Sequence, residues 1–200
     1  MVSAGLALAL LLSSATLVFG VQEVAQRRRT GRSSWVDPRR KGRVERVADT
    51  LFLAATALVT LSPVLVLVGA LEPAFAAWPV QAGGALLIAG SAVAARWAQR
   101  AMGAAWRTGV GDEDAGTLVE DGPFASVRNP VYSTIVAAST GAAALAPTLV
   151  AAAGVLTFVV ALQIQVRAVE EPHLRRLHGD RYGAYASRAG RFVPGIGRLR

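Results

Sequence analysis

The chain has 200 residues, of which 53% are hydrophobic, 17% are charged and none is a cysteine. This composition excludes a disordered chain, a disulfide-stabilised scaffold, a cysteine-ligated metal centre and a thiol nucleophile. The formal net charge of +8 lies in blocks that separate long uncharged segments, which is typical of a multi-pass membrane protein rather than a nucleic-acid-binding domain.

Four uncharged segments are candidates for crossing a membrane: residues 1–22, 50–71, 73–95 and 129–166. A transmembrane helix needs about 20 mostly apolar residues, so the last segment is long enough for two short helices, with Pro147 near the turn between them. The sequence therefore predicts an all-α integral membrane protein with about five transmembrane helices. A cleaved signal peptide is the alternative for the first segment, but its first three residues carry no Lys or Arg, which such a peptide requires.

The basic residues predict the orientation of these helices. Every Lys and Arg lies within residues 27–46, 96–128 or 167–200, and the intervening loops near Glu72 and Pro147 contain none. Because basic loops stay on the cytoplasmic side, the N-terminus should be outside and the C-terminus cytoplasmic. The preference for Arg over Lys and the abundant Ala point to a bacterial protein, so the expected location is the bacterial cytoplasmic membrane.

Small residues recur in the predicted helices, at Gly83-Gly84, at Gly90 and in the runs 142–144 and 151–154. In lipid, helices associate by packing rather than by the hydrophobic effect, and small residues let their backbones approach closely. These positions therefore predict tight helix–helix contacts.

Polar side chains flank the predicted hairpin of residues 129–166. Because a hairpin brings the start of its first helix beside the end of its second, residues near both ends should converge at one membrane face. Those residues are Arg128, Asn129, Tyr132, Arg167, Glu170 and Glu171. Ionisable residues near membrane depth are candidates for function, so we predict a functional site here.

Each of these residues also has a simpler interpretation. Arg128 can be a cytoplasmic anchor and Tyr132 an interfacial aromatic residue. Pro130 can be a first-turn helix proline, and Arg167 can pair with a glutamate three or four positions later on a helix surface. Their joint placement is what favours a functional site.

Two groups of motifs surround the predicted hairpin. The first reads T-L-V at residues 117–119, G-P-F at 122–124 and R-N-P-V-Y at 128–132; the second has Arg167, E-E at 170–171, Leu174, G-D at 179–180, Tyr182, Tyr185 and R-F-V-P at 191–194. In this order and spacing they resemble the isoprenylcysteine carboxyl methyltransferase and phospholipid methyltransferase family. The resemblance covers roughly residues 105–195, about half of the chain.

This resemblance implies a membrane-embedded methyltransferase that uses S-adenosylmethionine at the cytoplasmic face. By position, the cofactor would be lined by Thr117, Leu118, Val119 and Phe124, and its adenosine and amino-acid parts would be held by Asn129, Pro130, Val131 and Tyr132. Glu170 or Glu171 would accept hydrogen bonds from its ammonium or ribose hydroxyls. The implied catalytic residues are Arg128, Arg167 and Glu171, with Arg167 facing the substrate.

Three positions depart from the family pattern. Asn129 stands where many members have His, which removes a titratable group but keeps hydrogen-bonding capacity. Phe124 stands where Tyr is common and so lacks a hydroxyl group. His178 replaces the usual apolar residue before Gly179.

The expected partners follow from the apolar walls of such a site. The acceptor would be a lipophilic small molecule or lipid with a carboxylate, thiol or amine head, and membrane lipids would surround the protein. We expect no nucleic acid and no metal. The acidic run 112–114 lies in a glycine-flanked loop, where adjacent carboxylates rarely converge on one cation, and His173 and His178 are five positions apart without cysteine partners.

We divide the chain into residues 1–104, with three membrane helices and a basic loop, and residues 105–200, with the cofactor motif, the hairpin and the C-terminal tail. Two other functions stay open. One is an NADPH-dependent membrane reductase of the sterol-reductase type, whose C-terminal half resembles this one. The other is a non-enzymatic membrane scaffold or transporter component.

Overall fold

The computed structural model describes residues 2–31, 41–103 and 118–199. These residues are mostly helical; they form no strand, and their β-structure is limited to two isolated bridges. The all-α fold predicted from the sequence is confirmed. Thr117 and the acidic run 112–114 lie outside the described residues.

The N-terminal half contributes three long helices. The first is continuous from α1 (Val2–Ala15) through the π-helical segment η1 (Thr16–Gly20) to α2 (Val21–Thr30). The second is α3 (Arg43–Leu67) and the third is α4 (Trp78–Met102). Each covers one predicted membrane segment and extends beyond it into the basic residues that follow or precede it.

The predicted helical hairpin is present. Helix α5 (Pro130–Leu145) begins at Pro130, whose missing N–H costs nothing in a first turn. Helix α6 (Leu149–Ile164) begins after Thr148, whose side chain accepts a 3.0 Å hydrogen bond from the Ala151 N–H. Pro147 lies in the turn between the two helices, as predicted.

After the hairpin the chain stays helical and then changes direction. The π-helical segment η5 (Gln165–Glu170) leads into α7 (Glu171–Arg188), and residues 189–199 follow as an irregular C-terminal segment. Within α7, Gly179 has a φ of 49°, which a glycine adopts without strain and which bends the helix there. The C-terminal tail therefore begins as a kinked helix that ends at Arg188.

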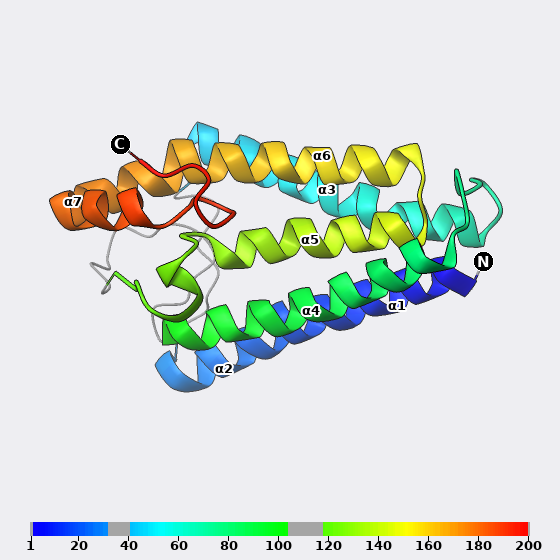
Figure 1. Cartoon of the computed structure of the whole chain (residues 1–200), viewed down its shortest axis with the longest axis horizontal. Coiled ribbons are helices and arrows are strands. Elements are labelled where there is room, and N and C mark those ends of the chain that lie inside the picture. The colour runs from blue at the N-terminus through cyan, green and yellow to red at the C-terminus, as the bar shows by residue number, and fades with distance from the viewer. Residues whose placement is uncertain (1, 32–40, 104–117, 200) are drawn as a thin grey trace.

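The helices form an elongated bundle, with α7 and the C-terminus at one end and the N-terminus at the other (Figure 1). The most extensive contacts join α4 to α5 and α3 to α6. At the first contact, a Cβ atom added to Gly84 would lie 2.6 Å from the Gly141 carbonyl oxygen; at the second, one added to Gly154 would lie 3.0 Å from the Val59 nitrogen. Glycine is therefore required at both crossings, which agrees with the prediction for Gly84 and for the run 151–154. A Cβ atom added to Gly83 or Gly90 would meet no atom within 4 Å, so the prediction is wrong at those two positions.

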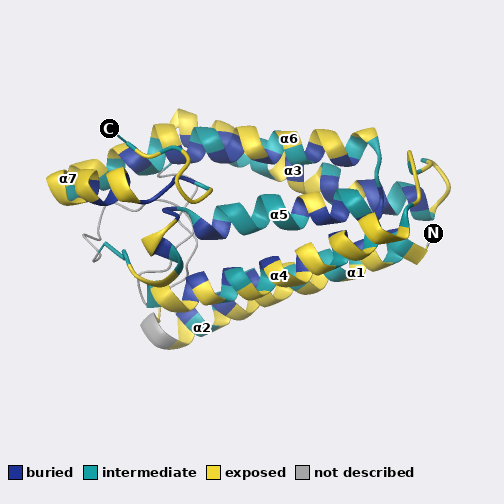
Figure 2. Ribbon diagram, viewed as in Figure 1, coloured by how far each residue is buried: buried dark blue, intermediate teal, exposed yellow. Residues whose placement is uncertain are grey.

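The outer surface of the bundle is largely apolar. Exposed positions lie along the outer faces of the long helices (Figure 2), and the large hydrophobic residues that are exposed include Leu53, Leu86, Val93 and Leu156. Within the described ranges, four helices are long and apolar enough to cross a membrane, and the shorter α5 is also apolar. Together they make the five helices of a multi-pass membrane protein.

The orientation of the bundle stays a prediction. A reporter fused after Arg200 should read cytoplasmic, and a reporter inserted at residues 71–74 should read exterior, because the flanking loops differ in basic residues. Alkaline phosphatase and green fluorescent protein fusions at both positions would measure this. A cytoplasmic signal from the insertion at 71–74 would contradict the predicted topology.

Candidate functional site

The two groups of sequence motifs meet at the end of the bundle that carries α7. The Arg128 N–H donates to the Gly190 carbonyl at 2.8 Å, and the Gly190 N–H donates to the Ser126 carbonyl at 2.9 Å. The Asn129 N–H donates to the Arg191 carbonyl at 3.2 Å. The loop before α5 and the segment after α7 are thus paired along their backbones, although more than 60 positions separate them.

A buried ion-pair network, here called the arginine clamp, consists of Arg128, Glu171 and Arg191. Glu171 Oε1 accepts hydrogen bonds from Arg128 Nη2 and Arg191 Nε, both at 2.8 Å, and its Oε2 accepts one from Arg191 Nη2 at 3.0 Å. The exposed fractions of the three side chains are 2%, 9% and 10%, in the order of their numbers. The pKa of Arg191 is raised, because its hydrogen bonds to Glu171 favour the charged guanidinium more than partial burial disfavours it.

Arg128 also holds the C-terminal segment through its backbone. Its guanidinium donates to the carbonyl oxygens of Ala186 and Ala189, and to that of Gly197 at 3.0 Å. These acceptors lie at the end of α7 and beyond it. The clamp therefore fixes both the loop before α5 and the C-terminal segment against the start of α7, and both Glu171 oxygens are used in doing so.

A second polar group, here called the Glu170 cluster, consists of Tyr132, Gln165 and Glu170. The Tyr132 hydroxyl donates to Glu170 Oε1 at 2.5 Å, and Gln165 Nε2 donates to the same oxygen at 3.3 Å. Gln165 is buried, and its Oε1 has no hydrogen-bond partner within the described part of the chain. A buried acceptor without a donor costs free energy, so this cluster is suited to a ligand that supplies donors.

Asn129 and Ser133 attach the start of α5 to the C-terminal segment. Asn129 Nδ2 donates to the Arg191 carbonyl at 3.0 Å, and Ser133 Oγ donates to the Phe192 carbonyl at 2.5 Å. The amide of Asn129 carries its N–H donors at any pH, so this bond does not depend on a titratable group. The departure from the family pattern at this position therefore keeps a structural hydrogen bond.

Apolar residues of the first motif pack beside these polar groups. Val119, Phe124 and Val131 form one cluster with Ala98 and Met102 of α4. Leu118 packs instead against the cluster that contains Tyr182 and Tyr185 of α7, and the Tyr185 hydroxyl donates to the Phe124 carbonyl at 2.8 Å. Pro130 is buried at the start of α5.

The structure brings most of the predicted site residues together. Glu170 contacts Tyr132, Glu171 contacts Arg128, and Asn129 contacts the backbone of Arg191. Arg167 is separate, because its side chain is exposed and its Nε donates to Gln163 Oε1 at 2.9 Å.

Two side chains of this end of the bundle are not found by reasoning from the sequence. Arg191 was part of a motif, but nothing in its spacing indicated that it pairs with Glu171. Gln165 is an uncharged residue within an apolar run, which carries no signal of its own. The one feature that could have drawn attention to it is a polar residue five and six positions before the two glutamates.

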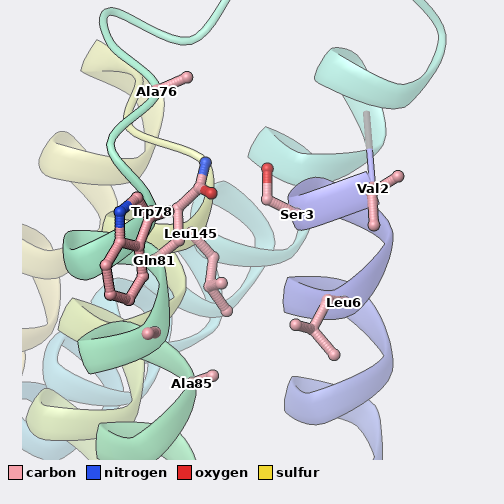
Figure 3. Close-up of a pocket in the computed structure, with 9 residues that line it drawn as sticks. Val2, Ser3, Leu6, Ala76, Trp78, Gln81, Ala85 and Leu145 are labelled. Atoms are coloured by element: carbon pink, nitrogen blue, oxygen red, sulfur yellow. The ribbon is translucent and has the colours of Figure 1, made fainter.

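A pocket of about 520 Å³ lies at the opposite end of the bundle (Figure 3). It separates the start of α1, with Val2 and Leu6, from the start of α4, with Trp78 and Gln81, and Leu145 also lines it. None of its lining residues is ionisable. It therefore lacks the charged groups that distinguish the end with α7.

One of three comparisons with known proteins gives a match. A family model described as phospholipid methyltransferase matches residues 79–181, which run from the start of α4 through α5 and α6 into α7. No curated protein and no solved structure matches the chain significantly.

Proposed function

This chain belongs to the phospholipid methyltransferase family, and on that premise we propose that it methylates a lipophilic acceptor with S-adenosylmethionine as the methyl donor. The observation that carries the proposal is the Glu170 cluster. It combines a carboxylate with a buried acceptor, Gln165 Oε1, that lacks a donor among the described residues. It lies where the two groups of motifs meet.

The residues present fit this cofactor. S-adenosylmethionine carries two cationic groups, a sulfonium and an ammonium, together with ribose hydroxyls that can donate hydrogen bonds. Glu170 and Gln165 offer acceptors for such donors, and Tyr132 bonds to Glu170. We propose that Asn129, Pro130 and Val131, which precede Tyr132, hold the cofactor with it. Leu118, Val119 and Phe124, with Thr117 before them in sequence, would line the adenosine. When bound, the cofactor supplies an electrophilic methyl group.

The arginine clamp would act on this site by positioning. Because both oxygens of Glu171 are bonded to arginines, we assign contact with the cofactor to Glu170 and the alignment of the surrounding segments to Arg128 and Glu171. Holding reactants in the correct geometry can supply a large part of a rate enhancement. Arg167, which is exposed at the end of the apolar helix pair, would orient the head of the acceptor.

The acceptor would reach the site from the lipid. The helices around the site expose apolar side chains, so an amphiphile could enter between them with its head at the level of Arg167. We propose a carboxylate, thiol or amine head. A carboxylate or thiolate can be methylated directly, whereas an ammonium must first lose a proton, for which a carboxylate at the site could serve as the base. The division into residues 1–104 and a catalytic half of 105–200, and the bacterial cytoplasmic location, stay predictions.

Binding of radiolabelled S-adenosylmethionine to the purified protein in nanodiscs tests the proposed function. We expect saturable binding that S-adenosylhomocysteine displaces and NADPH does not, because the buried acceptors at Glu170 and Gln165 favour a cationic ligand. Displacement by NADPH would favour the reductase. The absence of binding by either molecule would favour a non-enzymatic membrane component.

A further inference from the structure

A group of charged residues at the start of α3 lies against the proposed methyl-transfer site. Helix α3 packs on η5, the segment that carries Gln165 and Glu170. Glu45 interacts electrostatically with both Glu170 and Tyr132, and Asp49 interacts with Tyr132. The start of α3 lies outside residues 79–181, which the family model matches. These carboxylates are therefore an addition that this chain brings to the site from its N-terminal half.

The α3 carboxylates are only partly neutralised within the protein. Lys41 Nζ lies 2.7 Å from Asp49 Oδ2 and 3.8 Å from Glu45 Oε1. One ammonium group therefore forms ion pairs with two carboxylates. Glu45 is 7% exposed, and its Oε1 has no hydrogen-bond partner in the ranges that the structure describes. Lys41 is thus shared by Glu45 and Asp49, and Glu170 on η5 is bonded to Tyr132 and Gln165.

Not every buried acceptor of α3 and η5 has a donor in the described ranges. The Tyr132 hydroxyl and Gln165 Nε2 bond to Glu170. Lys41 Nζ bonds to Asp49, and at 3.8 Å it is too far from Glu45 Oε1 for a hydrogen bond. Two buried acceptors, Glu45 Oε1 and Gln165 Oε1, are left over. A buried acceptor that stays unpaired costs free energy, so a ligand that brings donors and positive charge fits this part of the structure.

An ammonium group fits these requirements better than a metal ion does. It carries three donors, no acceptor and one positive charge. Among the described residues, no three acidic, histidine or cysteine side chains are grouped closely enough to hold a metal ion. We propose that Glu45 and Asp49, together with Glu170 and Gln165, form a subsite that binds an ammonium group. This inference rests on the proposed function.

Two molecules of the proposed reaction can carry such an ammonium group. One is the cofactor, through its amino-acid part, and the other is an acceptor with an amine head. The chemistry of recognition is the same for both. The experiment therefore uses separate probes for each source.

The first arm measures the affinity of the full-length protein in nanodiscs for two nucleosides by calorimetry. S-adenosylhomocysteine carries the amino-acid ammonium, whereas 5′-methylthioadenosine lacks the amino-acid part. Glu45→Gln and Asp49→Asn should each weaken binding of S-adenosylhomocysteine about tenfold or more if the cofactor is the source, and should leave binding of methylthioadenosine unchanged. Glu72→Gln, an exposed carboxylate in the loop between α3 and α4, is the matched control.

The second arm measures the rise in Tm that oleylamine and oleate cause in the same nanodiscs. A ligand that binds the folded state raises Tm. If the acceptor is the source, oleylamine should raise the Tm of the wild type more than oleate does. Glu45→Gln should abolish that difference while the affinity for S-adenosylhomocysteine stays at the wild-type value.

Replacing Lys41 separates a binding role from a structural one. If Lys41, Glu45 and Asp49 only stabilise the start of α3, Lys41→Met and Asp49→Asn should weaken ligand binding alike, since both remove the same ion pair. If they bind an ammonium group, Lys41→Met removes a competing cation. Its affinity for the ammonium-bearing probe should then equal or exceed that of the wild type. Weakening by Lys41→Met to the level of Asp49→Asn would overturn the proposal.

The outcomes also distinguish this inference from the proposed function. If the wild-type protein binds both nucleosides, and the variants equal it in affinity for S-adenosylhomocysteine and in the Tm rise caused by oleylamine, the subsite is overturned and the methyltransferase proposal stands. Wild-type protein that binds neither nucleoside would overturn both. Circular dichroism and the Tm of each variant without ligand verify that it is folded.

Discussion

Replacing Glu171 with Gln is expected to lower the free energy of unfolding by about 3–5 kcal/mol, the effect of breaking a buried ion pair by removing one partner. The carboxylate of Glu171 bonds to Arg128 and Arg191, and all three side chains are at least nine-tenths buried. Without it, two guanidinium groups would share a largely buried region with no described counter-charge between them. Unfolding in a detergent of fixed composition, followed by circular dichroism, would measure the change.

The chain contains a matched control for this prediction. Glu120 also lies between two arginines, since it pairs with Arg181 and Arg188 at 2.9 Å each. Those arginine side chains are 63% and 69% exposed, and exposed ion pairs contribute only about 0–1 kcal/mol. Glu120→Gln should therefore change stability by less than about 1 kcal/mol. Equal losses in the two variants would show that Glu171 does not hold the C-terminal segment through buried charge.

The helices and the end of the bundle at which the motif residues converge can be predicted from a few features of the sequence. Uncharged segments of known length define the helices, and Pro147 in a run too long for one span defines the hairpin. Once the hairpin is assumed, Tyr132 and Glu170 must approach each other. The structure confirms this contact with a 2.5 Å hydrogen bond.

The exact partners at the site could not be predicted, because the chain leaves the α-helical period just before them. Residues 165–170 are π-helical, and a wider turn shifts the direction of every side chain that follows it. Regular α-helical spacing would place Arg167 beside Glu170 and Glu171. In the structure Arg167 bonds to Gln163, which precedes it, and Glu171 is free to enter the arginine clamp.

That the start of α3 lies at the site could not be predicted from the sequence, for a different reason. Lys41, Glu45 and Asp49 lie within a basic block whose obvious role is to set the membrane orientation, and four-residue spacing between opposite charges is common on exposed helices. Only the packing of α3 on η5 shows that Glu45 is buried near Glu170. Such a contact depends on how distant helices pack, which no local pattern encodes.

Replacing Glu170 with Gln is expected to weaken binding of S-adenosylmethionine about tenfold or more, because losing a charged acceptor for a ligand donor costs about 1.5–3 kcal/mol. The effect on folding should be smaller than that of Glu171→Gln. The described partners of Glu170 are the neutral groups of Tyr132 and Gln165, and a glutamine oxygen can still accept from the tyrosine. Calorimetric titration in nanodiscs would measure the affinity.

Tyr132→Phe separates the carboxylate itself from its surroundings. This variant removes the 2.5 Å hydrogen bond to Glu170 but keeps the carboxylate and the aromatic ring. If Glu170 binds the cofactor directly, Tyr132→Phe should weaken binding less than Glu170→Gln does, since the charge that attracts the ligand is still present. If Glu170 serves only to anchor α5 to η5, both variants should lower stability equally and leave binding unchanged. Wild-type affinity in Glu170→Gln would therefore rule out Glu170 as a cofactor ligand.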